Sequence, residues 1–465
     1  MKMKIKINLI TIVGFLGLIL IGILIILSMN SHPSFDDYAW PVWIKEMGWF
    51  NTQDFVYHAI NGRVLSTLIS TLTMTDPGYF LKYKLFCFLF LIIFLMSLYR
   101  LTRLMSFNTE KPKSIHFSFF SLVLYSIFLI IPESSSLFFW LTGVIVYSTT
   151  LILFFLLLSY FEIVDQNINP KIRKKYIYFS LGICAIIPLF SELGVFLISP
   201  LLIYKIVSTR AKLKEWNLFL ISLLLVLCSS MVINYIGSQT RITNLNQVTH
   251  NQDFYKSISL LLRSLVNYTT SYHALSLLVI NIALFCFIQV NNINKRSLFG
   301  VNSPHVLFCL GILTFIFGLF VSIFILGVKA PPRVWNLLIV PMEIFFISAF
   351  VVSQHKNEIK FSYKKTIFIF FFTSSLILPT TLRQICGDLF KGKVFFYNRF
   401  MNRQYVYSKE CKSDTLHLKK IESIKKPMSM MFKQGAGFAQ NSKSDDWYYN
   451  VYYAKYFKKQ IVYQK

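Results

Sequence analysis

Charged residues are scarce in this chain of 465 residues: Asp, Glu, Lys and Arg together make up 14%, whereas a soluble protein has about 25%. The acidic kind is scarcer, with 20 Asp and Glu against 47 Lys and Arg. No repeat occurs at solenoid periods and no tract is of low complexity, which argues against repeat arrays and disordered scaffolds. The sequence also lacks a glycine-rich nucleotide-binding loop, so we expect no bound nucleotide.

Apolar residues make up 55% of the chain. They occur in blocks of about 17 to 25 residues, which is the length of a helix that crosses a bilayer. The first block, residues 8–28, is too long for a signal peptide and has no cleavage-like site behind it, so we interpret it as an uncleaved helix. The sequence therefore predicts an all-α polytopic membrane protein with about 11 transmembrane helices. We expect them at 8–28, 79–99, 117–132, 137–160, 177–191, 192–208, 217–236, 273–290, 304–328, 335–353 and 366–383.

Lys and Arg concentrate in alternate loops, which predicts a cytoplasmic N-terminus by the positive-inside rule. This topology depends on a turn at Ser191-Glu192 within one apolar stretch, and it explains most of the net charge of +27, so nucleic acid is not an expected partner. We expect two units, a transmembrane domain over 1–383 and a small extracytoplasmic module over 384–465, with residues 63–75 as a helix on the outer surface. Whether Cys386 and Cys411 of the outer tail form a disulfide stays open.

The polar residues that stand out all fall on the predicted outer face. Each also has a plain structural interpretation. Asp36 and Asp37 could cap a helix, the arginines could reach lipid headgroups, and Trp140 could be an ordinary interface residue. As a set they could bind a sugar and a phosphate together, because arginine pairs with phosphate and a carboxylate accepts a hydroxyl proton or holds a divalent ion. The candidate residues are Asp36, Asp37, Arg63, Glu133, Trp140, Glu192, Arg241, Lys329 and Arg333.

A first helix followed by an outer loop with an acidic pair, many crossings and an outer C-terminal segment resembles the GT-C glycosyltransferases. Within that superfamily, "FDDYAW", "NGR", "FWLTGVIVY" and "SELG" look like the serotype-converting O-antigen glucosyltransferases. The resemblance covers roughly residues 1–340; the tail matches nothing that we can place. It implies a GT-C-like fold in the bacterial inner (cytoplasmic) membrane, with the C-terminus in the periplasm.

The resemblance also implies a reaction: a sugar, glucose being the first choice, moves from undecaprenyl phosphate to a lipid-linked glycan such as O-antigen. Asp36 or Asp37 would be the catalytic base or help to hold a metal, and Mg²⁺ or Mn²⁺ stays open as a cofactor. Arg63 and Arg333 would hold the donor phosphate. The remaining candidates would contact substrate, with Glu133 and Glu192 orienting sugar hydroxyls, beside Trp140, Arg241 and Lys329.

Two other functions compete with transfer. A flippase for polyprenyl-linked sugars would use the same phosphate-binding arginines, but should show paired repeats or charges through the bundle. An O-antigen polymerase would depend on outer-loop arginines and have less need of an acidic pair. The donor sugar, the acceptor residue and the linkage are not encoded in any pattern that we recognise.

Overall fold

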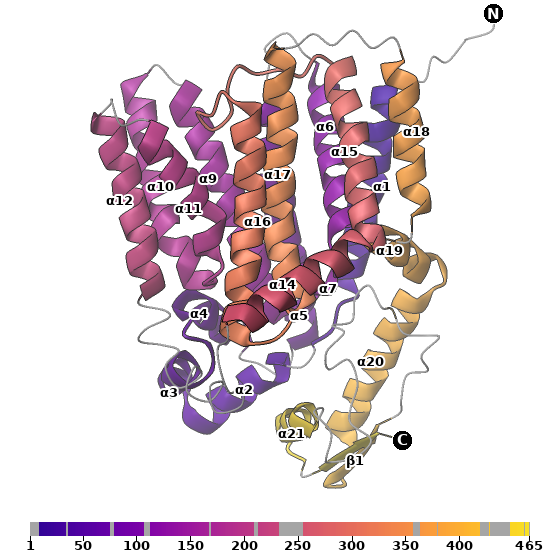
Figure 1. Cartoon of the computed structure of the whole chain (residues 1–465). Coiled ribbons are helices and arrows are strands. Elements are labelled where there is room, and N and C mark those ends of the chain that lie inside the picture. Colours follow the sequence, from indigo (N-terminus) through magenta and orange to yellow (C-terminus); the bar gives the residue numbers. More distant parts are fainter. Residues whose placement is uncertain are drawn as a thin grey trace, which may run out of the picture.

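The computed structural model of the protein describes residues 9–33, 36–74, 79–106, 112–166, 169–208, 213–231, 254–356, 363–378, 380–418, 427, 447–459 and 461–464. Long helices stand side by side as a bundle (Figure 1). They are α1 (Leu9–Met29), α5 (Tyr79–Ser106), α6 (Lys113–Ile130), α9 (Thr149–Gln166), α10 (Pro170–Phe190), α11 (Gly194–Ser208), α12 (Leu213–Met231), α15 (Tyr272–Val290), α16 (Pro304–Leu326), α17 (Pro332–Lys356) and α18 (Lys364–Ile377).

Shorter elements gather at one end of this bundle, the lower end in Figure 1, which we call the tail end because the C-terminal residues also lie there. We call the other end, where α1 begins, the loop end. The shorter elements are α2 (Asp36–Met47), α3 (Trp49–Phe55), the π-helix η1 (Val56–Asn61), α4 (Val64–Thr73), α7 (Ser135–Phe138), α8 (Leu141–Gly143), the π-helix η2 (Val144–Ser148), α14 (Phe254–Thr269), α19 (Thr381–Phe390), α20 (Lys393–Glu410), β1 (Thr415–Leu418), α21 (Trp447–Tyr456) and β2 (Ile461–Gln464).

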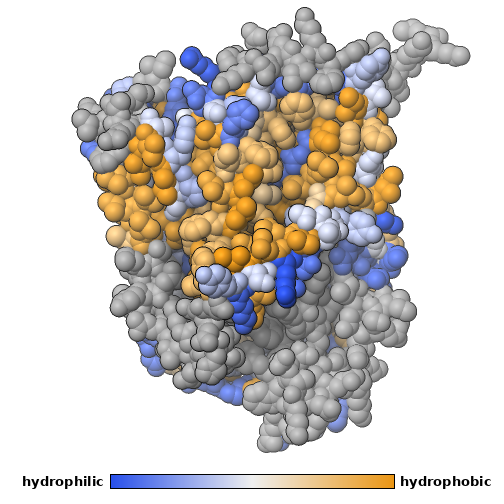
Figure 2. Space-filling model, in the orientation of Figure 1, coloured by the Kyte–Doolittle hydropathy of each residue, from blue (hydrophilic) through white to orange (hydrophobic). Residues whose placement is uncertain are grey.

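The helical, polytopic class predicted from the sequence is confirmed. In the described part of the chain, seven segments are long and apolar enough to cross a membrane, and an apolar band crosses the face of the bundle that Figure 2 shows. The seven are Leu9–Met29, Leu81–Ser106, Lys113–Ile130, Leu141–Gln166, Tyr272–Val290, Pro304–Ile325 and Pro332–Gln354. Helices α10, α11, α12 and α18 also lie where spans are expected, and their crossing stays a prediction.

Two expected helices differ in the structure, and one helix is present that was not expected. The stretch 366–383 is divided between α18 and α19, with Pro379 in the sequence at the break, because proline cannot continue a helix hydrogen-bond ladder. The stretch 137–160 is also interrupted, since α7 ends at Phe138 and α8 begins at Leu141. Helix α14 lies in what we expected to be a loop, and it runs obliquely across the bundle at the tail end (Figure 1).

Helices α4 and α14 turn apolar side chains outward, as a membrane-surface helix does. In α4 the buried side chains include Ser66, Thr67, Ser70 and Thr71, whereas Leu72 is 60% exposed. In α14, Leu262 is 56% exposed, but Leu261 is buried and the charged Lys256 and Arg263 are exposed. The reversed amphipathicity of α4 stabilises a helix only where its outer side meets lipid or another apolar partner. The helix expected over 63–75 is therefore present as α4.

The C-terminal part packs on the first short helix of the tail end. Tyr453 of α21 contacts Tyr38 of α2, with ring centroids 5.0 Å apart, and the indole N–H of Trp43 donates to the Tyr452 hydroxyl at 3.0 Å. Strand β1 pairs in parallel with β2, the strand that follows α21. Cys386 and Cys411 are both free thiols.

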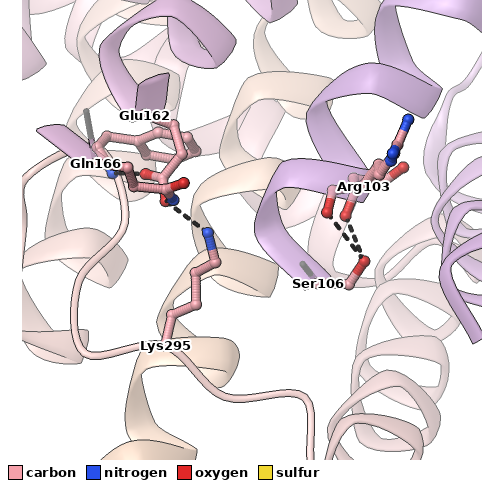
Figure 3. A network of polar contacts seen from close by, with 7 residues as sticks. Arg103, Ser106, Glu162, Gln166 and Lys295 are labelled. Atoms are coloured by element: carbon pink, nitrogen blue, oxygen red, sulfur yellow. Dashed lines mark hydrogen bonds and ion pairs between the residues drawn. The ribbon is translucent and has the colours of Figure 1, made fainter. Parts of the chain in front are cut away.

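At the loop end, the connection between α15 and α16 is fixed by buried charge. Glu162 of α9 accepts hydrogen bonds from Lys295 Nζ at 2.9 Å and from the Phe299 backbone N–H at 2.7 Å, and Gln166 donates to the same carboxylate (Figure 3). Lys205 pairs with Asp165 one turn later, at 3.0 Å. These contacts lie at the opposite end of the bundle from the candidate residues.

Candidate functional site

One buried segment, residues 132–148, links most of the candidate residues. We call it the hub segment. It follows α6, contains α7 and α8, and enters α9 through the π-helix η2. Nearly all of its side chains are buried, including Ser134, Ser135 and Ser136. Short π-helical turns inside α-helices occur frequently at functional sites. The π-helix η2, at the junction of the hub segment with α9, is therefore consistent with a functional role for this region.

Asp37 is fully buried and bound to the hub segment. Its Oδ1 accepts hydrogen bonds from the Thr142 backbone N–H at 3.2 Å and from the Thr142 hydroxyl at 2.7 Å. Its Oδ2 accepts from the Tyr83 hydroxyl at 3.0 Å. Such bonds favour the charged carboxylate and fix its position. Asp37 therefore joins α2 to α5 and to the hub segment, a geometry suited to positioning.

Two of the predicted residues cannot be placed, and a third lies apart. Asp36 is the first residue of α2, but its side chain lies outside what the structure describes, as does the whole of Arg241. Lys329 is exposed on the turn between α16 and α17.

Arg63 and Glu192 form a two-pronged ion pair. Arg63 Nε donates to Glu192 Oε2 at 2.7 Å and Nη2 donates to Oε1 at 2.8 Å, with side chains 14% and 26% exposed. Burial lowers the pKa of Arg63, but the Glu192 carboxylate and the Tyr147 hydroxyl outweigh it, so the pKa is raised above its ordinary value. The guanidinium is therefore held charged beside the hub segment.

The backbone places Arg63 through two special turns. The π-helix η1 ends at Gly62, whose φ of 64° is left-handed, and α4 starts directly after Arg63. Glu192 lies in the short turn between α10 and α11 that the sequence predicts. Tyr147, the third partner, belongs to η2. Both π-helical segments of the described chain thus flank this ion pair.

Arg333 approaches the hub segment from α17. Its guanidinium carbon lies 5.9 Å from the centroid of the Trp140 ring, within the range of a cation–π contact. One turn further along α17, the buried Asn336 donates to the Glu133 carbonyl and to the Ser136 hydroxyl. Glu133 itself is 5% exposed. One turn of α17 therefore contacts the hub segment twice, with Arg333 at the Trp140 ring and Asn336 at the Glu133 backbone.

A histidine joins the tail helix α20 to this region. Nε2 of His32 is 2.8 Å from Oδ1 of Asn398, which also accepts a hydrogen bond from Lys84 at 2.7 Å. The His32 ring meets the Tyr397 ring edge-on at 5.5 Å. Burial, with the nearby Lys84 charge, lowers the pKa of His32 to about 3. Burial and the charge of Asp37 raise the pKa of Tyr397.

The site of the described residues thus has two carboxylates, Glu133 and Glu192, two arginines and the anchored Asp37. No group of three or more His, Cys, Asp or Glu in the described ranges could hold a metal ion, and a divalent cation at Asp36 stays untested. Sequence reasoning missed Tyr83, Thr142, Tyr147 and Asn336. The last three stand in or beside the "FWLTGVIVY" and "RVWN" motifs, which were the available signal.

Comparisons with protein-family models, with curated proteins and with solved structures find no match for this chain.

Proposed function

We propose that the protein is a GT-C-type glycosyltransferase of the bacterial inner membrane. It moves a sugar, glucose being the first choice, from undecaprenyl phosphate to a lipid-linked glycan such as O-antigen. The tail end would face the periplasm. The resemblance of the motifs supports the superfamily, and the arrangement of charge supports the chemistry.

The observation that carries the proposal is convergence on the hub segment. Asp37 reaches it through Thr142, Arg63 through Tyr147 and Arg333 through Trp140. These residues come from α2, from the residue before α4 and from the start of α17, and Figure 1 shows α2 and α4 at the tail end. Lipid phosphates lie at this depth of a membrane, so the arginines are placed to meet one.

The buried contacts of Asp37 suggest that the two aspartates of the acidic pair have different roles. Hydrogen bonds from Tyr83 and Thr142 occupy both oxygens of its buried carboxylate, so it is fixed in place rather than open to an acceptor hydroxyl. We therefore assign positioning to Asp37 and the catalytic base to Asp36, the first residue of the same helix. Two adjacent residues on a helix point in different directions, so Asp37 can be anchored while Asp36 serves the acceptor.

The reaction then follows in one displacement. Asp36 takes the proton of the acceptor hydroxyl as its oxygen attacks the anomeric carbon. The bond to the polyprenyl phosphate oxygen breaks, and the phosphate leaves with the bonding pair. Arginines placed beforehand at that oxygen stabilise the growing charge, and the anomeric centre inverts. Glu133 and Glu192 would orient the sugar hydroxyls.

The test is transfer by the purified full-length protein, with radiolabelled sugar on undecaprenyl phosphate and a lipid-linked glycan acceptor. Labelled product from the wild-type protein, and none from the Asp36→Asn variant, is the expected result. Movement of the intact donor across a vesicle membrane, without formation of labelled glycan, would point to a flippase. Longer glycan chains with unchanged composition would point to a polymerase.

A further inference from the structure

A polar cavity opens at the tail end, beside the hub segment but on residues that the proposed reaction does not use. Its volume is about 600 Å³. Pro132, the first residue of the hub segment, forms one wall, and His273 at the start of α15 forms another. The remaining lining comes from α19 and the start of α20, including Arg383, Asp388 and Lys393.

The lining of this cavity carries excess positive charge. Arg383, Lys391 and Lys393 line it together with one carboxylate, that of Asp388. Asp388 is 3.7 Å from Lys393 and offsets one of the three cations. Arg383 donates through one nitrogen to the Ile377 carbonyl at 3.1 Å, which leaves most of its donors for a ligand. The cavity thus suits an anion with several acceptor oxygens, which is the chemistry of a phosphate.

Exposed apolar side chains border the cavity, which lies at the edge of the apolar band. Helix α19 lies directly below α15 and α18 in Figure 1, and in Figure 2 hydrophilic side chains border the apolar band at that place. Phe390 at the end of α19 is 83% exposed, Ile377 at the end of α18 is 74% exposed and Tyr272 is 60% exposed. A free anion in water would need no such apolar border, whereas a lipid phosphate would have its chains against it.

We propose that this cavity binds the phosphate group of a membrane lipid, either the phosphodiester of an anionic phospholipid or the diphosphate of a polyprenyl carrier. The two share their chemistry: oxyanions held by Arg383 and Lys391, with chains in the bilayer beside α15 and α18. Since Pro132 belongs to the hub segment, the bound lipid would have its headgroup next to the candidate site. This binding is independent of whether the protein transfers sugar.

The experiment measures lipid binding to the detergent-purified full-length protein by native mass spectrometry. The probes are phosphatidylglycerol, phosphatidylcholine, geranylgeranyl diphosphate and inorganic phosphate. The pocket variant is Arg383→Gln with Lys391→Gln. The control is Arg399→Gln with Arg403→Gln, which removes the same charge from exposed side chains of α20 outside the cavity lining.

We expect the pocket variant to bind phosphatidylglycerol or geranylgeranyl diphosphate on the order of tenfold or more weakly than wild type, and the control to bind normally. Whichever lipid shows the difference identifies the source of the phosphate. Equal binding by wild type and pocket variant would overturn the proposal, and so would binding of inorganic phosphate alone. If the double variant is unstable, Lys391→Gln alone, at an exposed position, should weaken binding several-fold.

Discussion

Arg63 and Glu192 meet through two parallel hydrogen bonds, at 2.7 and 2.8 Å, although 129 residues separate them in the chain. The pair fixes the start of α4 against the turn between α10 and α11. It also raises a question, because an arginine that is only a structural partner and an arginine that binds phosphate look alike in this geometry. Exchange of the two residues separates these roles.

We expect Arg63→Glu alone to place two carboxylates together and to destabilise the protein by several kcal/mol, since breaking a buried pair costs about 3–5 kcal/mol. Arg63→Glu with Glu192→Arg should restore most of the melting temperature. Transfer should stay at least about tenfold below wild type, because the guanidinium would then start from the turn between α10 and α11 and miss the position proposed for the donor phosphate. Full activity in the stable exchanged protein would reduce the pair to a structural link.

Much of the fold was predictable from periodicity and length, because apolar blocks that must cross a bilayer leave few other arrangements. The turn at Ser191-Glu192 and the surface helix after Arg63 are both present. Helix α14 was missed because its 16 residues include Lys256 and Arg263 and are too short and too polar for the bilayer-crossing blocks by which we located helices. The break between α18 and α19 was missed although Pro379 indicated it.

The site was predictable as a set of residues but not as a network. Local sequence could not indicate that Arg63 reaches Glu192 or that Asn336 reaches Glu133, since these pairs are joined only by helix packing. Nor could it distinguish Asp37, which is buried, from its neighbour. What decides such partners is the relative position of long helices, and that depends on contacts far apart in the chain.

His32 is buried and neutral, and it joins the end of α1 to α20. The pH dependence of the melting temperature therefore tests this contact. Its pKa is about 3 in the folded protein against about 6.5 in the unfolded chain. Between these values only the unfolded chain binds the proton, so stability falls as the pH falls, by roughly 1.4 kcal/mol per unit. We expect His32→Asn to lose less melting temperature than wild type between pH 7 and pH 5.

Control measurements for His32 use His58→Asn, because His58 is an exposed residue of η1. It should show the same acid sensitivity as wild type. If His32→Asn also follows the wild-type curve, the histidine is accessible to protons in the folded state.

The charge cluster around Glu162 should support folding without taking part in transfer. Lys295→Met would leave a carboxylate that is 2% exposed without its counter-charge, and we expect a loss of about 3–5 kcal/mol. Adding Glu162→Gln should recover part of that loss, because a neutral amide is cheaper to bury. Thermal unfolding in detergent measures both. A transfer rate that falls in the stable double variant would contradict this separation of the two ends.

Membrane topology can be tested at the two ends of the bundle. Lys and Arg gather at the loop end, including Lys174, Lys175 and Lys295, so we expect that end in the cytoplasm. Alkaline phosphatase fused after Lys465 should be active, and the same enzyme fused after Ser208 should be inactive. A cytoplasmic fluorescent reporter should give the reverse pattern. The opposite result at both positions would place the candidate site in the cytoplasm, out of reach of a periplasmic acceptor.

The acidic pair at the start of α2 gives the most direct test of the proposed chemistry. Asn caps a helix nearly as well as Asp but is no base. Asp36→Asn should therefore insert and melt like wild type while transfer falls by about 10²- to 10⁴-fold, the contribution of a general base. The measurement is product formation with the labelled donor, on protein whose melting temperature has been matched.

Asp37 should behave differently because its carboxylate is already occupied. Tyr83→Phe removes one hydrogen bond to Oδ2, and a lost hydrogen bond to a charged group costs about 1.5–3 kcal/mol. We expect Tyr83→Phe and Asp37→Asn each to lower the melting temperature. Activity should fall with the melting temperature in both variants, because both loosen α2. If Asp37→Asn is stable but inactive while Asp36→Asn transfers normally, the assigned roles are reversed. Full activity in both Asn variants would leave Asp37 as a structural contact and Asp36 without a part in the reaction, and the transferase proposal would lose its catalytic base.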